Sequence, residues 1–411
     1  MNWEIIKESY AELILKSGIK IREGQCIQIQ AEPYHWPFVH ILEKKAYELG
    51  AKYVYCKIDH PMSTVNMSRY QKAEYRGSVP SFLKPMIESL IEDEWSFLYF
   101  DGKADPELGK QINQEAMVKT QQAMMKTVKP MVAARMDGRC TWTIGALPTP
   151  KWAQMILGGR ADEENLKALW KILTPILRLD RDDPAQAWQA HAKTLKARCQ
   201  SLNNLSLSYL HFVGPQTDLK VHLAPRSRWT GGQIETAMGR SFIPNVPTEE
   251  VFTSPDFRKT EGKVKVTRPV TVLGDQVVGA WFEFKQGKVI DHGADEGKEL
   301  LDRFFEIDEK ARFLGEVALV DASSPIFQSG LIFHSILLDE NAACHIALGR
   351  AIDLAIDNHQ ELKTEDEKKA AGFNQSLQHI DFMIGSEEIS VTGYSLDGKP
   401  KQIIESGQFT I

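Results

Sequence analysis

Residues 24–59 read GQCIQIQAEPYHWPFVHILEKKAYELGAKYVYCKID, and their pattern indicates the fold class of the first half of the chain. Its first part, residues 24–32, alternates apolar and polar side chains as a half-buried strand does. Residues 37–59 then show a helical pattern, a glycine stop and a second apolar strand. A further strand is expected over residues 94–102. This strand–helix–strand order predicts an N-terminal α/β domain.

The second half of the chain consists mainly of short alternating segments separated by Gly, Pro and Asp, which predicts a strand-rich structure. A helix with Pro184 near its start is expected over residues 180–204, just before this change. Two further helices are expected over residues 296–313 and 341–358. A chain of 411 residues is longer than one core usually spans. We therefore predict two domains: an α/β domain at residues 1–200 and a mixed, strand-rich α+β catalytic domain at residues 201–411.

The overall composition excludes several classes of protein. The 49 basic and 55 acidic residues give a net charge of −6, whereas nucleic-acid binders normally carry a basic excess. No apolar run approaches the length of a membrane span, and the N-terminus mixes charged with apolar residues, unlike a signal peptide. The five cysteines lie far apart without a CxxC motif, so neither a disulfide framework nor a zinc ribbon is indicated. We expect a cytoplasmic protein with no nucleic-acid or membrane partner.

The sequence contains no GxSxG, HExxH, GxxxxGK[ST] or GxGxxG motif. Its sharpest feature is the pair His379 and Asp381 in HIDFMIG, which would share one face of a strand. A charged pair in this apolar setting is costly unless a partner such as a metal neutralises it, although the pair alone does not establish a ligand role. A second pair, His359 and Glu361, lies in a charged, solvated stretch. Residues 289–297, VIDHGADEG, are interpreted as a strand end, a turn and an acidic helix start.

Three further residues are candidates for a site. His345 lies among small residues in ENAACHIALG, which would leave space beside a helix for a bound group; the alternative is a core histidine bonded to a backbone carbonyl. Glu316 begins the apolar strand GEVALV, either as a cap for neighbouring backbone or as a site residue. Glu250 lies between two prolines in NVPTEEVFTSP, where one of Glu249 and Glu250 is expected to face solvent. The alternative for this segment is a surface turn.

Eight segments of the chain, in order, resemble those of one family. The segments are TWTIGALPTPKWAQ, LHFVGPQTDLKV, RSRWTGGQ, NVPTEEVFTSP, GEVALV, SPIFQSG, DENAACHIALG and HIDFMIGSEEISVTG. They are similar to segments of the thermophilic-type metalloaminopeptidases, peptidase family M29, also called aminopeptidase T, S or II, and the resemblance extends over most of the chain.

This resemblance implies a hydrolase that removes N-terminal amino acids from peptides with a free N-terminus, acting as a homodimer. It carries the family's metal ligands over to five positions: Glu250, Glu316, His345, His379 and Asp381. These three carboxylates and two imidazoles form an N/O set suited to two divalent ions, Zn, Co or Mn. Such a pair of ions can activate a water molecule and polarise the scissile carbonyl. One of Glu250 and Glu316 could act as general base, and the sequence does not show which.

The chain departs from the family pattern at one position. The family places a tyrosine seven residues after the histidine that corresponds to His345, and this chain has Ile352 there. Tyr394 is the nearest tyrosine, but its spacing gives no reason to assign it that place. The departure supports an alternative function, a degenerate member that binds peptide or metal with little turnover. An unrelated α/β transferase is a second alternative, suggested only by the N-terminal strand–helix–strand pattern.

Overall fold

A computed structural model describes residues 3–102, 104–236 and 239–411. The chain divides into two compact units, one of residues 1–190 and 233–247 and the other of residues 191–232 and 248–411. The chain therefore passes between the units three times, because residues 233–247 return to the first unit. The domain boundary placed at residue 200 from the sequence stays a prediction.

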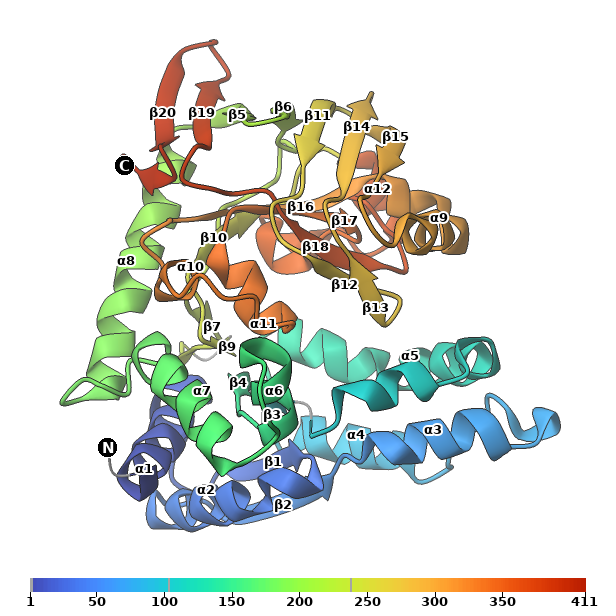
Figure 1. Cartoon of the computed structure of the whole chain (residues 1–411), viewed down its shortest axis with the longest axis vertical. Helices are drawn as coiled ribbons and strands as arrows, with labels where there is room; N and C mark the ends of the chain where they lie inside the picture. The colour runs from blue at the N-terminus through green and yellow to red at the C-terminus, as the bar shows by residue number, and fades with distance from the viewer. Residues whose placement is uncertain (1–2, 103, 237–238) are drawn as a thin grey trace. The chain divides into compact units, whose positions relative to one another are not determined.

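The first unit is built on a parallel sheet with the strand order β2-β1-β3-β4-β9 (Figure 1). Parallel neighbours need crossover connections, and helices supply them. The α/β fold predicted from residues 24–59 is therefore confirmed. The strands are β1 (Cys26–Ala31), β2 (Tyr53–Ile58), β3 (Ser96–Asp101), β4 (Trp142–Ala146) and β9 (Asn245–Val246), with a short β7–β8 hairpin (Ile234–Glu235, Ser241–Phe242). The helices are α1 (Trp3–Leu13), α2 (Trp36–Glu48), α3 (Pro61–Tyr70), α4 (Leu83–Glu92), α5 (Gln114–Met136), α6 (Pro150–Leu157) and α7 (Glu163–Ile176).

The second unit contains two antiparallel sheets that share one hydrophobic core. The smaller sheet has the order β10-β16-β17-β18, formed by Glu250–Thr253, Leu314–Val320, His345–Gly349 and His379–Met383. The larger has the order β15-β14-β11-β6-β5-β19-β20-β21, formed by Lys288–Gly293, Trp281–Lys285, Glu261–Lys265, Thr217–His222, Leu207–Gly214, Ser390–Ser395, Pro400–Glu405 and Gln408–Phe409. A separate hairpin pairs β12 (Val270–Val272) with β13 (Asp275–Val277). The predicted strand-rich second half is confirmed.

The helices of the second half agree only in part with the sequence pattern. The predicted helix near residues 180–204 is α8 (Pro184–Asn204), which crosses the boundary between the units. Within residues 296–313 lie α9 (Lys298–Ile307) and a 3-10 turn (Glu309–Arg312). The remaining helices are the short α10 (Pro325–Gln328), α11 (Ile336–Asp339) and α12 (Glu365–Ala370). No helix within the described residues is both long enough and apolar enough to cross a membrane.

The helix predicted over residues 341–358 is wrong. His345–Gly349 form strand β17, which lies between β16 and β18 with every residue buried. A strand buried on both faces loses the alternation that identifies strands, so its run of small apolar residues resembles a buried helix. Gly349 ends the strand with a φ of 116°, a backbone conformation that a helix does not accept.

Candidate metal centre

One face of the four-stranded sheet brings the predicted ligands together. In the strand register, Glu316 on β16 faces Ala347 on β17, and Ala347 faces Asp381 on β18. Residues two apart on a strand share a face, so His379 and His345 belong to this face as well. The residue between the two carboxylates is an alanine. Its small side chain leaves space above β17 for the side chains of Glu316 and Asp381.

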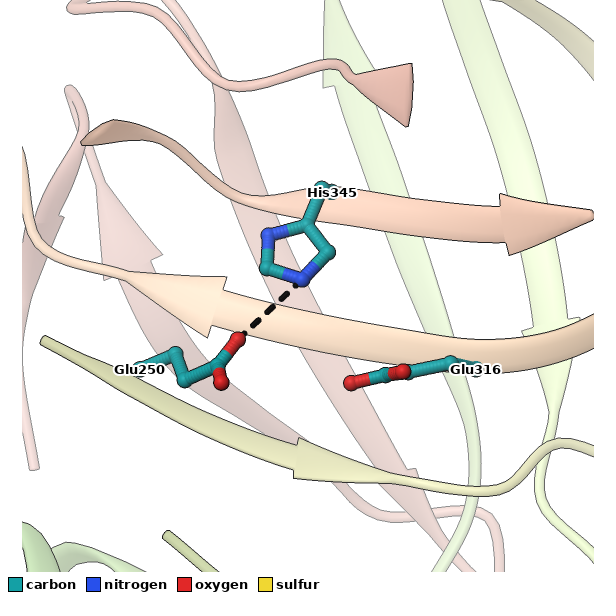
Figure 2. A group of neighbouring side chains, drawn as sticks. All are labelled: Glu250, Glu316 and His345. Carbon is teal, nitrogen blue, oxygen red and sulfur yellow. Dashed lines mark ion pairs between the residues drawn. The ribbon is translucent and has the colours of Figure 1, made fainter. Parts of the chain in front are cut away.

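Glu250 completes the set from the edge of the same sheet. It begins β10 and pairs with Val320 of β16. Its Oε2 lies 3.1 Å from Nε2 of His345, and Figure 2 shows the side chains of Glu250, Glu316 and His345 converging on one space from three strands. The two glutamates and His345 are buried. The structure thus places this trio in the interior of the second unit.

A β-bulge at Gly315 turns Glu316 toward the site. Leu314 pairs with Leu348 and Glu316 with Ala347, so two steps along β16 correspond to one step along β17. Leu314 consequently lies in the hydrophobic core, whereas Glu316 lies on the site face. A Cβ atom at Gly315 would lie 2.2 Å from the carbonyl oxygen of Arg350, which is far inside van der Waals contact. The bulge therefore requires glycine.

The five side chains form two triads that share one residue. Glu250, Glu316 and His345 form the first, and Glu316, His379 and Asp381 form the second. Nε2 of His379 lies 3.2 Å from Oε2 of Glu316 and 3.3 Å from Oδ1 of Asp381. Within each triad the potential ligand atoms lie within 4.8 Å of one another. Metal bonds of about 2.0–2.6 Å keep two ligand atoms within roughly 5 Å, so each triad has the dimensions to hold one ion.

Both imidazole rings are oriented by backbone carbonyls. Nδ1 of His345 lies 3.1 Å from the carbonyl oxygen of Ala343, and Nδ1 of His379 lies 2.7 Å from that of Arg350. A carbonyl only accepts, so the hydrogen-bond network assigns the proton to Nδ1 in both rings. Each Nε2 then has a lone pair when the ring is neutral and faces the carboxylates. This is the arrangement of metal-ligating histidines, which donate their other ring nitrogen to an oxygen.

The charges of the centre shift the pKa values of its members. Burial raises the pKa of Glu316 to about 6, although the hydrogen bond and the charge of His379 act to lower it. Burial lowers the pKa of His345, but the carboxylates around it, Glu250 first, outweigh burial and raise it to about 10. The pKa of His379 is likewise held well above its usual range by Asp381 and Glu316, against burial. Burial favours the neutral form of Asp381, and His379 reverses this and lowers its pKa. The centre therefore strongly favours cations, whether protons or metal ions.

The sequence reasoning missed Glu340, which follows α11 in the segment DENAACHIALG. Burial raises its pKa well above the usual range, and the charges of Glu250 and Asp381 raise it further. Its Oε1 accepts a hydrogen bond of 3.3 Å from Nδ2 of the buried Asn341. The only signal in the sequence is its place five residues before His345. Its proximity to the centre follows from the return of β17 beside β16.

The expectation that one of Glu249 and Glu250 faces solvent is wrong, because both side chains are buried. Oε2 of Glu249 lies 3.2 Å from Nε2 of His191 on α8, and its backbone N–H donates to Oδ1 of Asn341 at 2.6 Å. These partners lie 58 and 92 residues away. The segment begins a strand of the sheet and is not a surface turn.

Two of the other sequence features, His292 and Tyr394, belong to the eight-stranded sheet and lie apart from this constellation. Nε2 of His292 lies 2.8 Å from Oδ1 of Asp302 on α9, which begins at Lys298, so the strand end and helix start predicted at residues 289–297 are confirmed. Tyr394 stacks on Tyr209 in the eight-stranded sheet, with ring centroids 4.5 Å apart, and is thus engaged outside the four-stranded sheet. Ile352 lies just beyond the end of β17.

Residues 5–409 match the family described as thermophilic metalloprotease (M29). Aminopeptidase 2 of Geobacillus stearothermophilus is 36% identical over 407 residues, which cover 99% of this chain and 98% of that protein. Aminopeptidase T of Thermus aquaticus is 36% identical over 402 residues, which cover 98% and 97%. The structure of wild-type AmpT from Thermus thermophilus matches with a TM-score of 0.91 at 33% identity and covers 100% of both chains. The similarity therefore extends over both units.

Proposed function

The chain belongs to the M29 family of thermophilic metalloproteases, and we propose that it is a metal-dependent aminopeptidase that removes N-terminal amino acids from peptides. The observation that carries this proposal is the pair of triads that share Glu316 on one face of a sheet. Relatives named as aminopeptidases align with the chain over nearly its whole length. The chemistry of the residues and the similarity of the chain thus point to the same reaction.

In this proposal Glu250, Glu316, His345, His379 and Asp381 hold two divalent ions, Zn, Co or Mn. The donor set supports it, because nitrogen and oxygen ligands suit these ions and three buried carboxylates need cationic partners. When bound, the ions would polarise the scissile carbonyl and lower the pKa of a water molecule. Glu316 belongs to both triads, so it would serve as a ligand in either.

The proton-accepting role is assigned to Glu250. A carboxylate that ligates two ions has little remaining basicity, which argues against Glu316. Glu250 belongs to one triad only, so one of its carboxylate oxygens would ligate an ion while the other could still accept a proton. Its Oε2 is buried beside Nε2 of His345. A base there would accept a proton from the attacking water and return it to the leaving amine. We expect Glu250→Gln to retain at least one ion while kcat falls by about 10² to 10⁴, whereas Glu316→Gln loses metal from both triads.

The test of the function combines metal analysis with hydrolysis of leucine p-nitroanilide and alanine p-nitroanilide. Exhaustive chelation is expected to abolish hydrolysis, and Zn, Co or Mn is expected to restore it. N-acetyl-leucine p-nitroanilide, which lacks a free amino group, is the control for exopeptidase action. Full activity with no detectable metal would refute the metallopeptidase. Stoichiometric metal with no turnover would instead support the degenerate binder that Ile352 suggests.

Two further features belong to the proposal. The protein is expected to be a homodimer, and large apolar side chains exposed on the first unit support this: Tyr70 at the end of α3, Phe82 just before α4 and Met125 on α5 are 78%, 65% and 63% exposed, and α5 contacts both α3 and α4. Light scattering of the wild type and of Phe82→Glu would test the oligomeric state and the part that this surface plays in it.

A cytoplasmic location is also part of the proposal. The five cysteines are free thiols, and the reducing environment of the cytoplasm keeps cysteines in this form.

A further inference from the structure

The two histidines of the centre take their orientation from different parts of the chain. Nδ1 of His345 donates to the carbonyl of Ala343, which lies two residues earlier in the same segment. Nδ1 of His379 donates instead to the carbonyl of Arg350, which lies 29 residues earlier. The orientation of His345 is therefore local, whereas that of His379 depends on how the segment around Arg350 is held.

Residues 349–351, the end of β17 and the two residues after it, contact both strands that carry the second triad. A Cβ atom at Gly315 would lie 2.2 Å from the carbonyl oxygen of Arg350, so this carbonyl packs against the bulge that orients Glu316. The same carbonyl accepts the hydrogen bond from His379 on β18. A change in the path of the 349–351 segment would therefore displace His379 and loosen the bulge.

Asn374 holds the 349–351 segment from both of its ends. Its Nδ2 donates to the carbonyl of Gly349 at 2.7 Å, and its backbone carbonyl accepts from the N–H of Ala351 at 2.9 Å. Both neighbours of Arg350 are thus bonded to one asparagine, which fixes the direction of the carbonyl between them. Asn374 is 2% exposed, so these bonds are shielded from solvent.

The same side chain joins the 349–351 segment to the residues before β16. Nδ2 of Asn374 lies 2.8 and 3.1 Å from the carbonyl oxygens of Lys310 and Phe313. The carbonyl of Phe313 also accepts from the N–H of Gly349 at 2.8 Å. One buried amide group therefore serves three backbone carbonyls, and its removal would leave buried acceptors without their donor. Asn374 links the approaches to three of the four strands of the sheet.

We propose that Asn374 is a positioning residue for the second triad. It fixes the 349–351 segment, and the carbonyl of Arg350 then directs Nε2 of His379 toward the two carboxylates of that triad. This inference rests on the proposed function, in which the second triad holds an ion. Asn374 acts through the backbone of this segment and is not itself a ligand. Its loss is expected to weaken the ion of the second triad and to spare the ion of the first.

The alternative is that Asn374 contributes only to the stability of the second unit. Its replacement would then lower both metal affinities together, or change neither. A positioning role separates the two ions, because His345 takes its orientation from its own segment and keeps it when the 349–351 segment moves. The relative effect on the two ions therefore distinguishes the two roles.

The main experiment titrates the metal-free, full-length protein with Co²⁺ and follows the visible spectrum and the number of bound ions. Asn374→Ser is expected to weaken the second ion about 10- to 100-fold and to leave the first within about threefold. His379→Ala gives the reference spectrum of the single ion that remains. Asn165→Ser is the matched control, because Nδ2 of Asn165 donates to two backbone carbonyls of the first unit, at 2.7 and 3.0 Å. The control is expected to leave both ions unchanged.

A second measurement needs no metal. In protein labelled with nitrogen-15 histidine, an Nδ1 proton bonded to a carbonyl gives a downfield resonance. Asn374→Ser is expected to shift or broaden the resonance of His379 and to leave that of His345 in place. A folded variant in which both resonances are unchanged would refute the positioning role.

Ser376→Ala is a milder variant that decides the question if Asn374→Ser does not fold. The hydroxyl of Ser376 accepts from the N–H of Gln378 at 3.0 Å, and the carbonyl of Gln378 accepts from the N–H of Arg350 at 2.7 Å. Its loss removes one bond from the same backbone network, and we expect the second ion to weaken about three- to tenfold. Wild-type affinity for both ions in this variant would refute the role of the segment.

The outcomes separate this inference from the proposed function. Equal weakening of both ions in Asn374→Ser, or an unchanged second ion, would refute the positioning role and leave the aminopeptidase standing. A wild type that binds two ions but cleaves no free aminoacyl p-nitroanilide would refute the aminopeptidase and leave the role of Asn374 standing.

Discussion

Ala347 lies directly opposite Glu316 across strands β17 and β16, and the same alanine faces Asp381 on its other side. One small side chain thus separates two carboxylates that come from strands 65 residues apart in the sequence. The space above it is where the two triads meet at Glu316. The size of residue 347 is therefore as important to the centre as the ligands themselves.

Replacing Ala347 with leucine is expected to abolish metal binding. The added methylene groups would occupy the space between Glu316 and Asp381, and overpacking a fully buried position costs about 1–3 kcal/mol of stability. Ala347→Gly serves as the control, because it leaves that space open. Metal analysis and thermal unfolding should show a folded leucine variant with little metal and a glycine variant with full metal. A leucine variant that keeps both ions would contradict this view of the centre.

Gly315→Ala is expected to damage both stability and the metal site. Its Cβ would lie 2.2 Å from a backbone oxygen, so β16 must shift and the bulge that orients Glu316 is lost. We expect a loss of roughly 1–3 kcal/mol in urea unfolding, together with reduced metal content. At Gly109 a Cβ would meet no atom within 4 Å, so Gly109→Ala should change neither property. Equal behaviour of the two variants would contradict the role of the bulge.

Metal affinity is expected to rise with pH. The pKa of His345 is raised to about 10, so the metal-free protein carries a proton on this ring at neutral pH, and an ion must displace it to reach Nε2. Raising the pH removes the competing proton. The apparent affinity should therefore increase up to about tenfold per pH unit between roughly 7 and 10. Calorimetry in buffers of different ionisation enthalpy measures the released protons, and binding without proton release would contradict the shift.

Ile352→Tyr is expected to raise turnover by tenfold or more in the metal-saturated protein. A phenol can donate to a developing oxyanion, and a lost donor of this kind typically costs about 10² to 10³ in rate. The neighbouring Asp353 is held by Lys368, with both carboxylate oxygens 2.7 Å from Nζ, so the backbone that carries residue 352 is anchored. Steady-state kinetics on leucine p-nitroanilide measure the effect. An unchanged or lower kcat would show that the site has compensated for the isoleucine.

The features of this protein that depend on local pattern could be predicted from the order of its residues. The alternation in residues 24–32 and the helical spacing after it determine the α/β layer of the first unit, because strand and helix periods are properties of neighbouring residues. The same reasoning placed His379 and Asp381 on one face of a strand, where the structure has them. The family-like segments supplied Glu250, Glu316 and His345 as candidates.

How these residues meet depends on contacts between segments that are far apart in the sequence. His345 lies on a strand because β16 and β18 bury its segment on both sides, and that burial removes the local pattern which would have identified a strand. The bulge at Gly315, the burial of Glu249 and the approach of Glu340 depend in the same way on partners far away in the sequence. Contacts of this kind are set by the pairing of distant strands, and periodicity within one segment carries no information about them.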